Sequence, residues 1–227
     1  MKKGILIDMG DTIVYNLNMD FKRGLNSLYD ELNIVNVDRC DFVEYSMKLL
    51  SDIFNERKFI EFKMIDYIRF ILEYYNINTD YLIEELEEIF AFNCCETKFI
   101  DGVLDFLFYL KEKKYPIILL SNTSFSKTVI KKMLGEMYKI FDDIIVSSDY
   151  PFRKPNHYIF DLGIAKLNMD KKGIYYIGNS MYYDVYGSNE AGINSIWFNE
   201  KEGKKVDLGN FKYIEIKTYK QLIDMNF

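Results

Sequence analysis

Residues 6–15 read LIDMGDTIVY, and this stretch places two acids after an apolar run. An apolar run that begins at Ile5 ends in an acid, Asp8, and a second acid, Asp11, follows three positions later. A carboxylate that directly follows a short buried strand is placed at the edge of a sheet, where α/β proteins bind their ligands. The stretch therefore predicts a strand that delivers an acidic side chain to a functional site.

The hydrophobic pattern divides the rest of the chain into two parts. Residues 16–95 repeat apolar side chains at helical spacing in four successive groups, which predicts four amphipathic helices. After residue 95, short β-rich runs alternate with helical patterns, and the runs are PIILL, DIIVSS, GIYYI, SIWF and YIEI. Such alternation is typical of parallel strands joined by right-handed crossovers. We expect an α/β fold with a doubly wound parallel sheet over residues 1–15 and 96–227, interrupted by a helical cap domain at 16–95.

The composition excludes several classes of function. The formal net charge of -6 argues against nucleic-acid binding, which needs a basic face. No apolar run approaches the roughly twenty residues of a membrane-spanning helix. The three cysteines, Cys40, Cys94 and Cys95, are odd in number and two are adjacent, which favours a reducing cytoplasm over a disulfide framework. A single histidine, His157, gives little support to a zinc site. The oligomeric state stays open.

Polar side chains follow the expected strands at the points where those strands end. Because the carboxyl ends of parallel strands meet at one edge of a sheet, these side chains should converge there. The residues are Asp8, Ser121, Asn122, Lys154, Asn179 and Asp184.

At these positions the sequence resembles the haloacid dehalogenase (HAD) superfamily, in the branch with a helical type I cap. LIDMGDTI resembles the first motif of that family, IILLSN the second, FRKP the third and YIGNSMYYDVYGSNEAGI the fourth. The motifs occur in the family's order, each after an expected strand, and the four expected helices fall where the family has its cap. The resemblance covers essentially the whole chain and implies a Rossmann-like core.

The resemblance also implies roles for the converging residues. Asp8 matches the nucleophile, Lys154 the cation beside the transferred phosphoryl group, and Ser121 the hydroxyl that binds this group. Ser121 and Asn122 are expected to contact the substrate, although the pair could also cap the helix that follows. The implied cofactor is Mg²⁺, and its implied ligands are Asp8, the backbone carbonyl of Gly10, Asn179 and Asp184.

Two positions depart from the family pattern. Asn179 replaces an acid; its amide oxygen can still bind a cation, but one negative charge is lost. Gly10 stands where phosphatases have a second Asp, which protonates the leaving group, a contribution typically worth about 10² to 10⁴ in rate. Strand alternation would place Asp11 on the side opposite to Asp8, so we expect Asp11 mainly to fix the turn, and the alternative is that it reaches the site through water. An enzyme without this acid should favour good leaving groups.

The leading hypothesis is a Mg²⁺-dependent phosphohydrolase that acts on a small phosphorylated metabolite, either a mononucleotide or a sugar phosphate. A carboxylate with a reference pKa of about 3.9 is deprotonated at neutral pH, so Asp8 needs no base in order to form an aspartyl-phosphate. One alternative is a metal-independent 2-haloacid dehalogenase, and another is a catalytically weakened binding protein of the same fold. One or two basic residues of the insertion should face the site; the candidates are Lys22, Arg23, Arg57, Lys58, Lys63 and Arg69.

Overall fold

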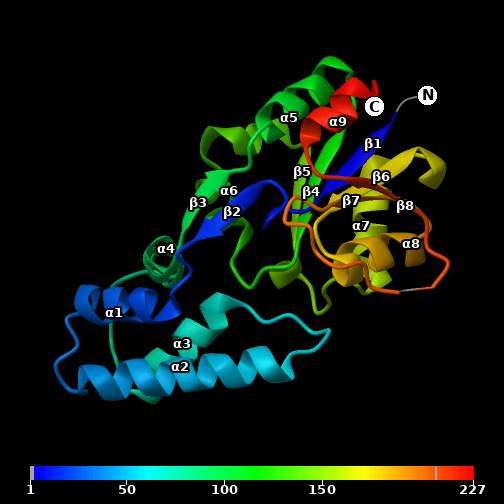
Figure 1. The fold of residues 1–227 in the computed structure, drawn as a ribbon. Coiled ribbons are helices and arrows are strands. Elements are labelled where there is room, and N and C mark those ends of the chain that lie inside the picture. The colour runs from blue at the N-terminus through cyan, green and yellow to red at the C-terminus, as the bar shows by residue number, and fades with distance from the viewer. Residues whose placement is uncertain (1–2, 208) are drawn as a thin grey trace.

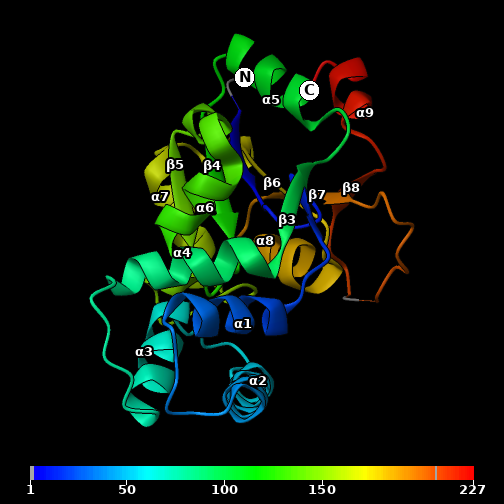
Figure 2. The same cartoon turned by 90° about the vertical axis from the view of Figure 1, so that its left-hand side faces the viewer.

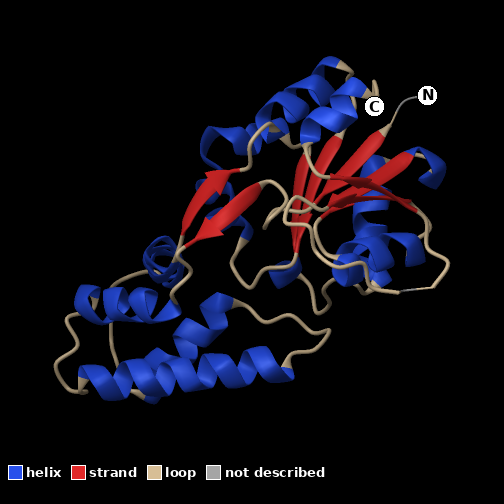
Figure 3. Cartoon of the chain, viewed as in Figure 1, coloured by secondary structure: helices blue, strands red, loops and turns tan. Residues whose placement is uncertain are grey.

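The computed structural model describes residues 3–207 and 209–227. Within these residues, six parallel strands form one sheet in the order β5-β4-β1-β6-β7-β8 (Figures 1 and 3). The strands are β1 (Gly4–Ile7), β4 (Ile117–Ser121), β5 (Asp143–Val146), β6 (Ile174–Gly178), β7 (Asn194–Phe198) and β8 (Tyr213–Ile216). Each strand coincides with one of the apolar runs read from the sequence, so the predicted doubly wound α/β sheet is confirmed.

The helices cover both faces of the sheet because successive side chains along a strand point to opposite faces. Ile5 and Ile7 belong to a buried cluster with residues of α5 (Val103–Glu112), α6 (Lys127–Leu134) and α9 (Tyr219–Asp224). Leu6 belongs to a second cluster with residues of α7 (His157–Leu167), which contacts the short helix α8 (Gly187–Glu190). The remaining helical turns are Gly135–Ile140, Ser147–Asp149, Lys171–Gly173 and Met181–Tyr186.

Four consecutive helices lie together at one end of the molecule (Figures 1 and 2). They are α1 (Phe21–Glu31), α2 (Arg39–Glu56), α3 (Met64–Tyr74) and α4 (Ile83–Cys94), and they confirm the four amphipathic patterns. Asp20 and Asp38 begin α1 and α2 by accepting hydrogen bonds from backbone N–H groups of the first turn. No helix in the described residues combines the length and the apolar character needed to cross a membrane.

A two-stranded antiparallel ladder joins the four helices to the sheet. It consists of β2 (Val14–Leu17) and β3 (Glu96–Phe99), with Val14 opposite Phe99 and Leu17 opposite Glu96. The sequence analysis missed both strands, because neither VYNL nor ETKF is a continuous apolar run and their pairing spans about eighty residues. The predicted domain boundaries at 15/16 and 95/96 fall at this ladder, and the division into two domains stays a prediction.

Helices α1 and α4 approach each other closely at Gly24, which is buried. A Cβ atom at this position would lie 2.5 Å from the Sγ of Cys94 and 2.8 Å from the carbonyl oxygen of Phe90. Both separations are shorter than a van der Waals contact, and the carbonyl belongs to the backbone of α4. The missing side chain at Gly24 is therefore what allows the two helices to pack at this distance.

We expect Gly24→Ala to lower the free energy of unfolding by a net of about 1 kcal/mol, since overpacking of this kind typically costs about 1–3 kcal/mol. The roughly 1 kcal/mol that alanine gains over glycine in a helix acts in the opposite direction. Urea denaturation followed by circular dichroism measures the difference. Lys22→Ala on the exposed side of the same helix is the control, and it should stay within about 0.5 kcal/mol of the wild type. A Gly24→Ala protein as stable as this control would contradict the steric argument.

Candidate functional site

Asp8 lies at the centre of the carboxyl edge of the sheet, because β1 pairs with β4 on one side and with β6 on the other. Ser121 ends β4, and Asn179 directly follows β6. A cavity of about 540 Å³ opens at this edge, and the predicted site residues all line it: Asp8, Gly10, Ser121, Asn122, Lys154, Asn179 and Asp184. The structure thus brings these residues together, while their chemical roles stay predictions.

The ammonium group of Lys154 is buried between two carboxylates. Its Nζ lies 2.9 Å from the Oδ1 of Asp8 and 2.6 Å from the Oδ1 of Asp184, and its side chain is only 2% exposed. It also donates a hydrogen bond of 2.7 Å to the hydroxyl of Tyr176. A buried charge is tolerated only when it is paired and hydrogen-bonded, and all three partners meet that requirement here.

This arrangement determines the protonation states of the group. Burial alone would lower the pKa of Lys154, but the carboxylates of Asp184 and Asp8 outweigh burial and hold it above its ordinary value. Burial and the nearby charge of Asp184 raise the pKa of Asp8 to about 6, although Lys154 acts in the opposite direction. At neutral pH Asp8 is therefore mostly a carboxylate, and one ammonium faces two carboxylates.

Asn122 fixes the backbone of Lys154. Its Oδ1 accepts a hydrogen bond of 2.8 Å from the backbone N–H of Lys154, and its Nδ2 donates one of 3.0 Å to the carbonyl of the same residue. Helix α6 is capped by Ser126, whose hydroxyl accepts from the N–H of Val129. The alternative role of Ser121 and Asn122 as a helix cap is therefore wrong, because α6 begins too late in the chain.

The hydroxyl of Ser121 is available to a ligand. Ser121 is 5% exposed and lines the cavity. Among the residues that the structure describes, none forms a hydrogen bond with this hydroxyl. A nearly buried hydroxyl normally has a partner, so an acceptor supplied by a bound molecule would complete it. The prediction that Ser121 contacts the substrate stays open, and its geometry suits that role.

The oxygen atoms around Asp8 fit a hard divalent cation in their chemistry. Asp8 offers a carboxylate, Asn179 an amide oxygen, and Gly10 a backbone carbonyl that accepts no hydrogen bond from residues 3–207 or 209–227. A cation would also offset the excess carboxylate charge that Lys154 leaves. No group of three or more His, Cys, Asp or Glu side chains suited to a metal occurs in the described part of the chain. An ion held here would thus depend on the amide and the carbonyl.

Asp184 orients Lys154. Its Oδ1 accepts hydrogen bonds from the Nζ of Lys154 and the hydroxyl of Tyr176, and its Oδ2 accepts one of 2.8 Å from the N–H of Ser180. A Cβ atom at Gly178 would lie 2.4 Å from the Cγ of Asp184, so only glycine leaves room for the carboxylate against β6. These contacts show Asp184 positioning Lys154. Its role as a metal ligand stays a prediction.

Asp11 also lines this cavity, but its carboxylate forms an ion pair outside the group around Lys154. It adopts the left-handed conformation (φ 51°), and its carboxylate pairs with Lys201 at 2.8 Å in an exposed position. The turn at Asp11 therefore directs its side chain to Lys201. At Gly10 a Cβ atom would meet only the Nδ2 of Asn16, at 3.4 Å, so the site has room for a side chain that the sequence does not supply.

Three residues that shape the site were not predicted from the sequence: Tyr176, Arg153 and Glu61. Tyr176 accepts a hydrogen bond from the ammonium of Lys154. The sequence indicates only that Tyr176 lies on β6, two residues before the glycine that ends the strand. Arg57 and Arg153 line the cavity, and Glu61 is buried beside both. Arg57 was one of six basic candidates in the insertion, and Arg153 directly precedes Lys154, but nothing in the sequence singled out Glu61.

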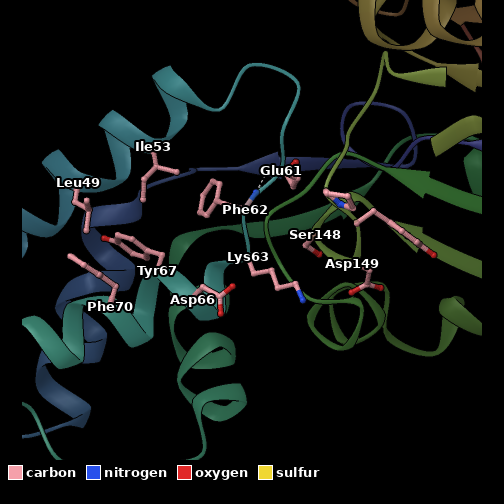
Figure 4. Close-up of a pocket in the computed structure, with 12 residues that line it drawn as sticks. Leu49, Ile53, Glu61, Phe62, Lys63, Asp66, Tyr67, Phe70, Ser148 and Asp149 are labelled. Carbon is pink, nitrogen blue, oxygen red and sulfur yellow. Dashed lines mark hydrogen bonds between the residues drawn. The ribbon is translucent and has the colours of Figure 1, made fainter. Parts of the chain in front are cut away.

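A second cavity, of about 600 Å³, lies between the four helices and the sheet (Figure 4). Apolar side chains of α2 and α3, such as Leu49, Ile53 and Phe70, line one side, and Ser148 and Asp149 line the other. Asp8, Ser121 and Lys154 do not border this cavity. The chemistry therefore belongs to the smaller cavity, and His157 takes no part because it pairs with Asp161 on the exposed start of α7.

Comparisons with known proteins agree with this geometry. Residues 5–198 match the family model described as haloacid dehalogenase-like hydrolase. Glyceraldehyde 3-phosphate phosphatase from Pyrococcus abyssi is 27% identical over 105 residues, which cover 46% of this chain and 43% of that protein. The chain thus spans about half the length of the curated relatives it matches.

Solved structures resemble the whole chain. The putative HAD-hydrolase YfnB from Bacillus subtilis, bound to magnesium, has a TM-score of 0.62 and 22% identity, with 99% of this chain and 98% of that chain covered. A 2-haloacid dehalogenase from Pseudomonas syringae pv. Tomato DC3000 has a TM-score of 0.68 and 18% identity, with 100% and 98% covered. At these identities the likeness concerns the fold, which phosphate and halide chemistry share.

We expect Tyr176→Phe to lower the free energy of unfolding by about 2 kcal/mol, because hydrogen bonds to charged groups contribute about 1.5–3 kcal/mol. The change removes the hydroxyl that contacts Lys154, Asp184 and the carbonyl of Leu120. Tyr175→Phe on the same strand is the matched control, since its hydroxyl forms no hydrogen bond with the described residues. Chemical denaturation of the two variants compares them, and equal losses would contradict the anchoring role of Tyr176.

Proposed function

Since the chain belongs to the family of haloacid dehalogenase-like hydrolases, we propose that it is a phosphohydrolase acting on a small phosphorylated metabolite. The observation that carries this proposal is the meeting, in one cavity, of a deprotonated Asp8, a buried ammonium of Lys154 and a hydroxyl of Ser121 that has no hydrogen-bond partner among the described residues. These are the groups that transfer of a phosphoryl group needs: a nucleophile, a positive charge and a hydrogen-bond donor.

Asp8 acts as the nucleophile in two steps. A carboxylate oxygen of Asp8 attacks phosphorus, a bond forms between them, and the bond from phosphorus to the leaving oxygen breaks. The leaving oxygen takes its proton from water, because Gly10 supplies no acid. Water then attacks the phosphorus of the aspartyl-phosphate, releases inorganic phosphate and restores the carboxylate. The pKa of about 6 leaves Asp8 ready to react at neutral pH without a separate base.

Lys154 and Ser121 hold the group that is transferred. The ammonium of Lys154 is fixed by Asn122 through its backbone and by Asp184 and Tyr176 through its side chain, so it needs no reorganisation when negative charge develops. Ser121 donates its hydroxyl proton to a phosphoryl oxygen. Asp8, the Gly10 carbonyl and Asn179 would hold Mg²⁺, with Asp184 behind them. When bound, the ion supplies positive charge that offsets the repulsion between the phosphate and the carboxylates.

A small substrate suits the enclosed site. A cavity of about 540 Å³ lies in the range of small-molecule sites and accommodates a sugar phosphate or a mononucleotide. The partial match to glyceraldehyde 3-phosphate phosphatase from Pyrococcus abyssi supports a substrate of this class.

The first test is hydrolysis of para-nitrophenyl phosphate, with Mg²⁺ or with EDTA. Asp8→Asn should lower kcat by at least about 10³-fold, because it removes the nucleophile. Asp11→Asn is the matched control: the same substitution, at the acid that pairs with Lys201, should change kcat by less than about threefold. EDTA should abolish the reaction. Activity that survives in Asp8→Asn would contradict the proposal, and EDTA-resistant chloride release from 2-chloropropionate would replace it with dehalogenation.

The open space at Gly10 gives a second test. Wild-type enzyme should hydrolyse para-nitrophenyl phosphate much faster than glycerol 3-phosphate, because only the poorer leaving group needs an acid. We expect Gly10→Asp to raise kcat on glycerol 3-phosphate at least about tenfold, since general acid catalysis is worth about 10² to 10⁴. Gly10→Asn has the same shape without the proton and should give no gain. If the two variants behaved alike, the missing acid would not be what limits this enzyme.

A further inference from the structure

Two arginines from distant parts of the sequence line the cavity. Arg57 lies at the end of α2, on the segment that joins α2 to α3, and Arg153 lies in the loop before Lys154. Both line the same cavity as Asp8. Their side chains are 21% and 9% exposed, so neither is a freely solvated surface charge.

One buried carboxylate holds both arginines. The side chain of Glu61 is fully buried; its Oε1 lies 2.9 Å from the Nη1 of Arg57, and its Oε2 lies 3.4 Å from the Nε of Arg153. Ser147 donates a hydrogen bond of 2.7 Å to the same Oε2, and the backbone N–H of Phe62 donates to Oε1. Glu61 is therefore fixed from four directions, and it fixes the two guanidinium groups in turn.

The charges of this cluster do not balance. Two guanidinium groups face one carboxylate, so one positive charge is left without an acidic partner among residues 3–207 and 209–227. In the part of the chain that the structure describes, the Arg153 guanidinium donates no hydrogen bond, and its Nε is buried without a hydrogen-bond partner. The ring of Tyr183 lies 5.8 Å from its Cζ and covers one face. A nearly buried guanidinium with unused donors is matched by an oxyanion, which accepts two parallel hydrogen bonds.

We propose that Arg57 and Arg153 bind a second oxyanion of the substrate, so that the preferred substrates are phosphomonoesters that carry a carboxylate or another phosphate. This inference rests on the proposed function and adds to it the substrate class. The transferred phosphoryl group already has Lys154 and Ser121 as partners, which leaves the arginine pair for the rest of the molecule. Arg57 belongs to the helical segment, and Arg153 belongs to the loop that precedes Lys154. The pair would therefore bind the substrate where the helical segment meets the sheet edge.

A matched pair of substrates tests the proposal. 3-Phosphoglycerate and glycerol 3-phosphate share a three-carbon skeleton and differ in a carboxylate against a hydroxymethyl group. We expect kcat/KM to be at least about tenfold higher for 3-phosphoglycerate. Fructose 1,6-bisphosphate against fructose 6-phosphate tests a phosphate as the second anion. Whichever pair shows the larger ratio identifies the preferred anion, and ratios near one for both pairs would overturn the proposal.

Substitutions locate the preference. Arg57→Gln and Arg153→Gln should each bring the larger ratio to within about threefold of one, whereas Lys58→Gln, at the exposed neighbour of Arg57, should leave it unchanged. Equal losses on both members of a pair would place the arginines on the transferred phosphoryl group and overturn the proposal. If a variant fails to fold, which circular dichroism detects, the wild-type ratios still decide.

Calorimetry separates this inference from the proposed function. The Asp8→Asn protein should bind 3-phosphoglycerate at least about tenfold more tightly than glycerol 3-phosphate even though it does not hydrolyse either. The same binding preference in a wild-type protein without hydrolytic activity would refute the proposed function alone. Equal binding by Asp8→Asn, together with Asp8-dependent hydrolysis in the wild type, would refute the anion site alone.

Discussion

The buried ammonium of Lys154 is the constraint on which the site depends. Removing one partner of a buried ion pair typically costs about 3–5 kcal/mol, so the groups around Lys154 must stay in place. Asp8 comes from the end of β1, Tyr176 from β6, and Asp184 from the helical turn Met181–Tyr186. One charge thus ties three separate segments together at the centre of the sheet. The same contacts that stabilise this part of the fold hold the carboxylate of Asp8 beside the ammonium of Lys154.

The sheet and its carboxyl edge could be predicted because they depend on local signals. Each parallel strand is a short apolar run, and the polar residue after it inherits its position from the strand, as Asp8 and Ser121 show. The ladder of β2 and β3 was not predicted, because half-exposed strands contain no continuous apolar run. Their pairing joins residues that are far apart in the sequence. Glu61 was not predicted for a related reason. Its position depends on a hydrogen bond with Ser147, 86 residues away, and no local sequence pattern indicates that contact.

The sheet edge and the helical segment contribute different residues to the cavity. The sheet edge carries the residues to which we assign the chemistry, and buried contacts hold several of them, as Asn122 holds Lys154. The helical segment reaches this edge through the residues between α2 and α3, where the carbonyl of Phe59 accepts from the N–H of Arg153 and Glu61 accepts from Ser147. Residues of both parts thus border one cavity, and buried contacts hold the two parts together there.

The ladder between β2 and β3 has a consequence for how such a chain can diversify. Leu17 and Glu96 are paired neighbours, so the polypeptide leaves the sheet and returns to it at a single point. The number of residues in between therefore does not alter this pairing. Closing a longer loop costs little entropy, with each doubling of its length adding only about 0.6 kcal/mol. Changes of length within the helical segment, away from its contacts with the sheet edge, are therefore thermodynamically cheap, whereas exchange of the whole segment would also remove buried contacts such as that of Glu61 with Ser147.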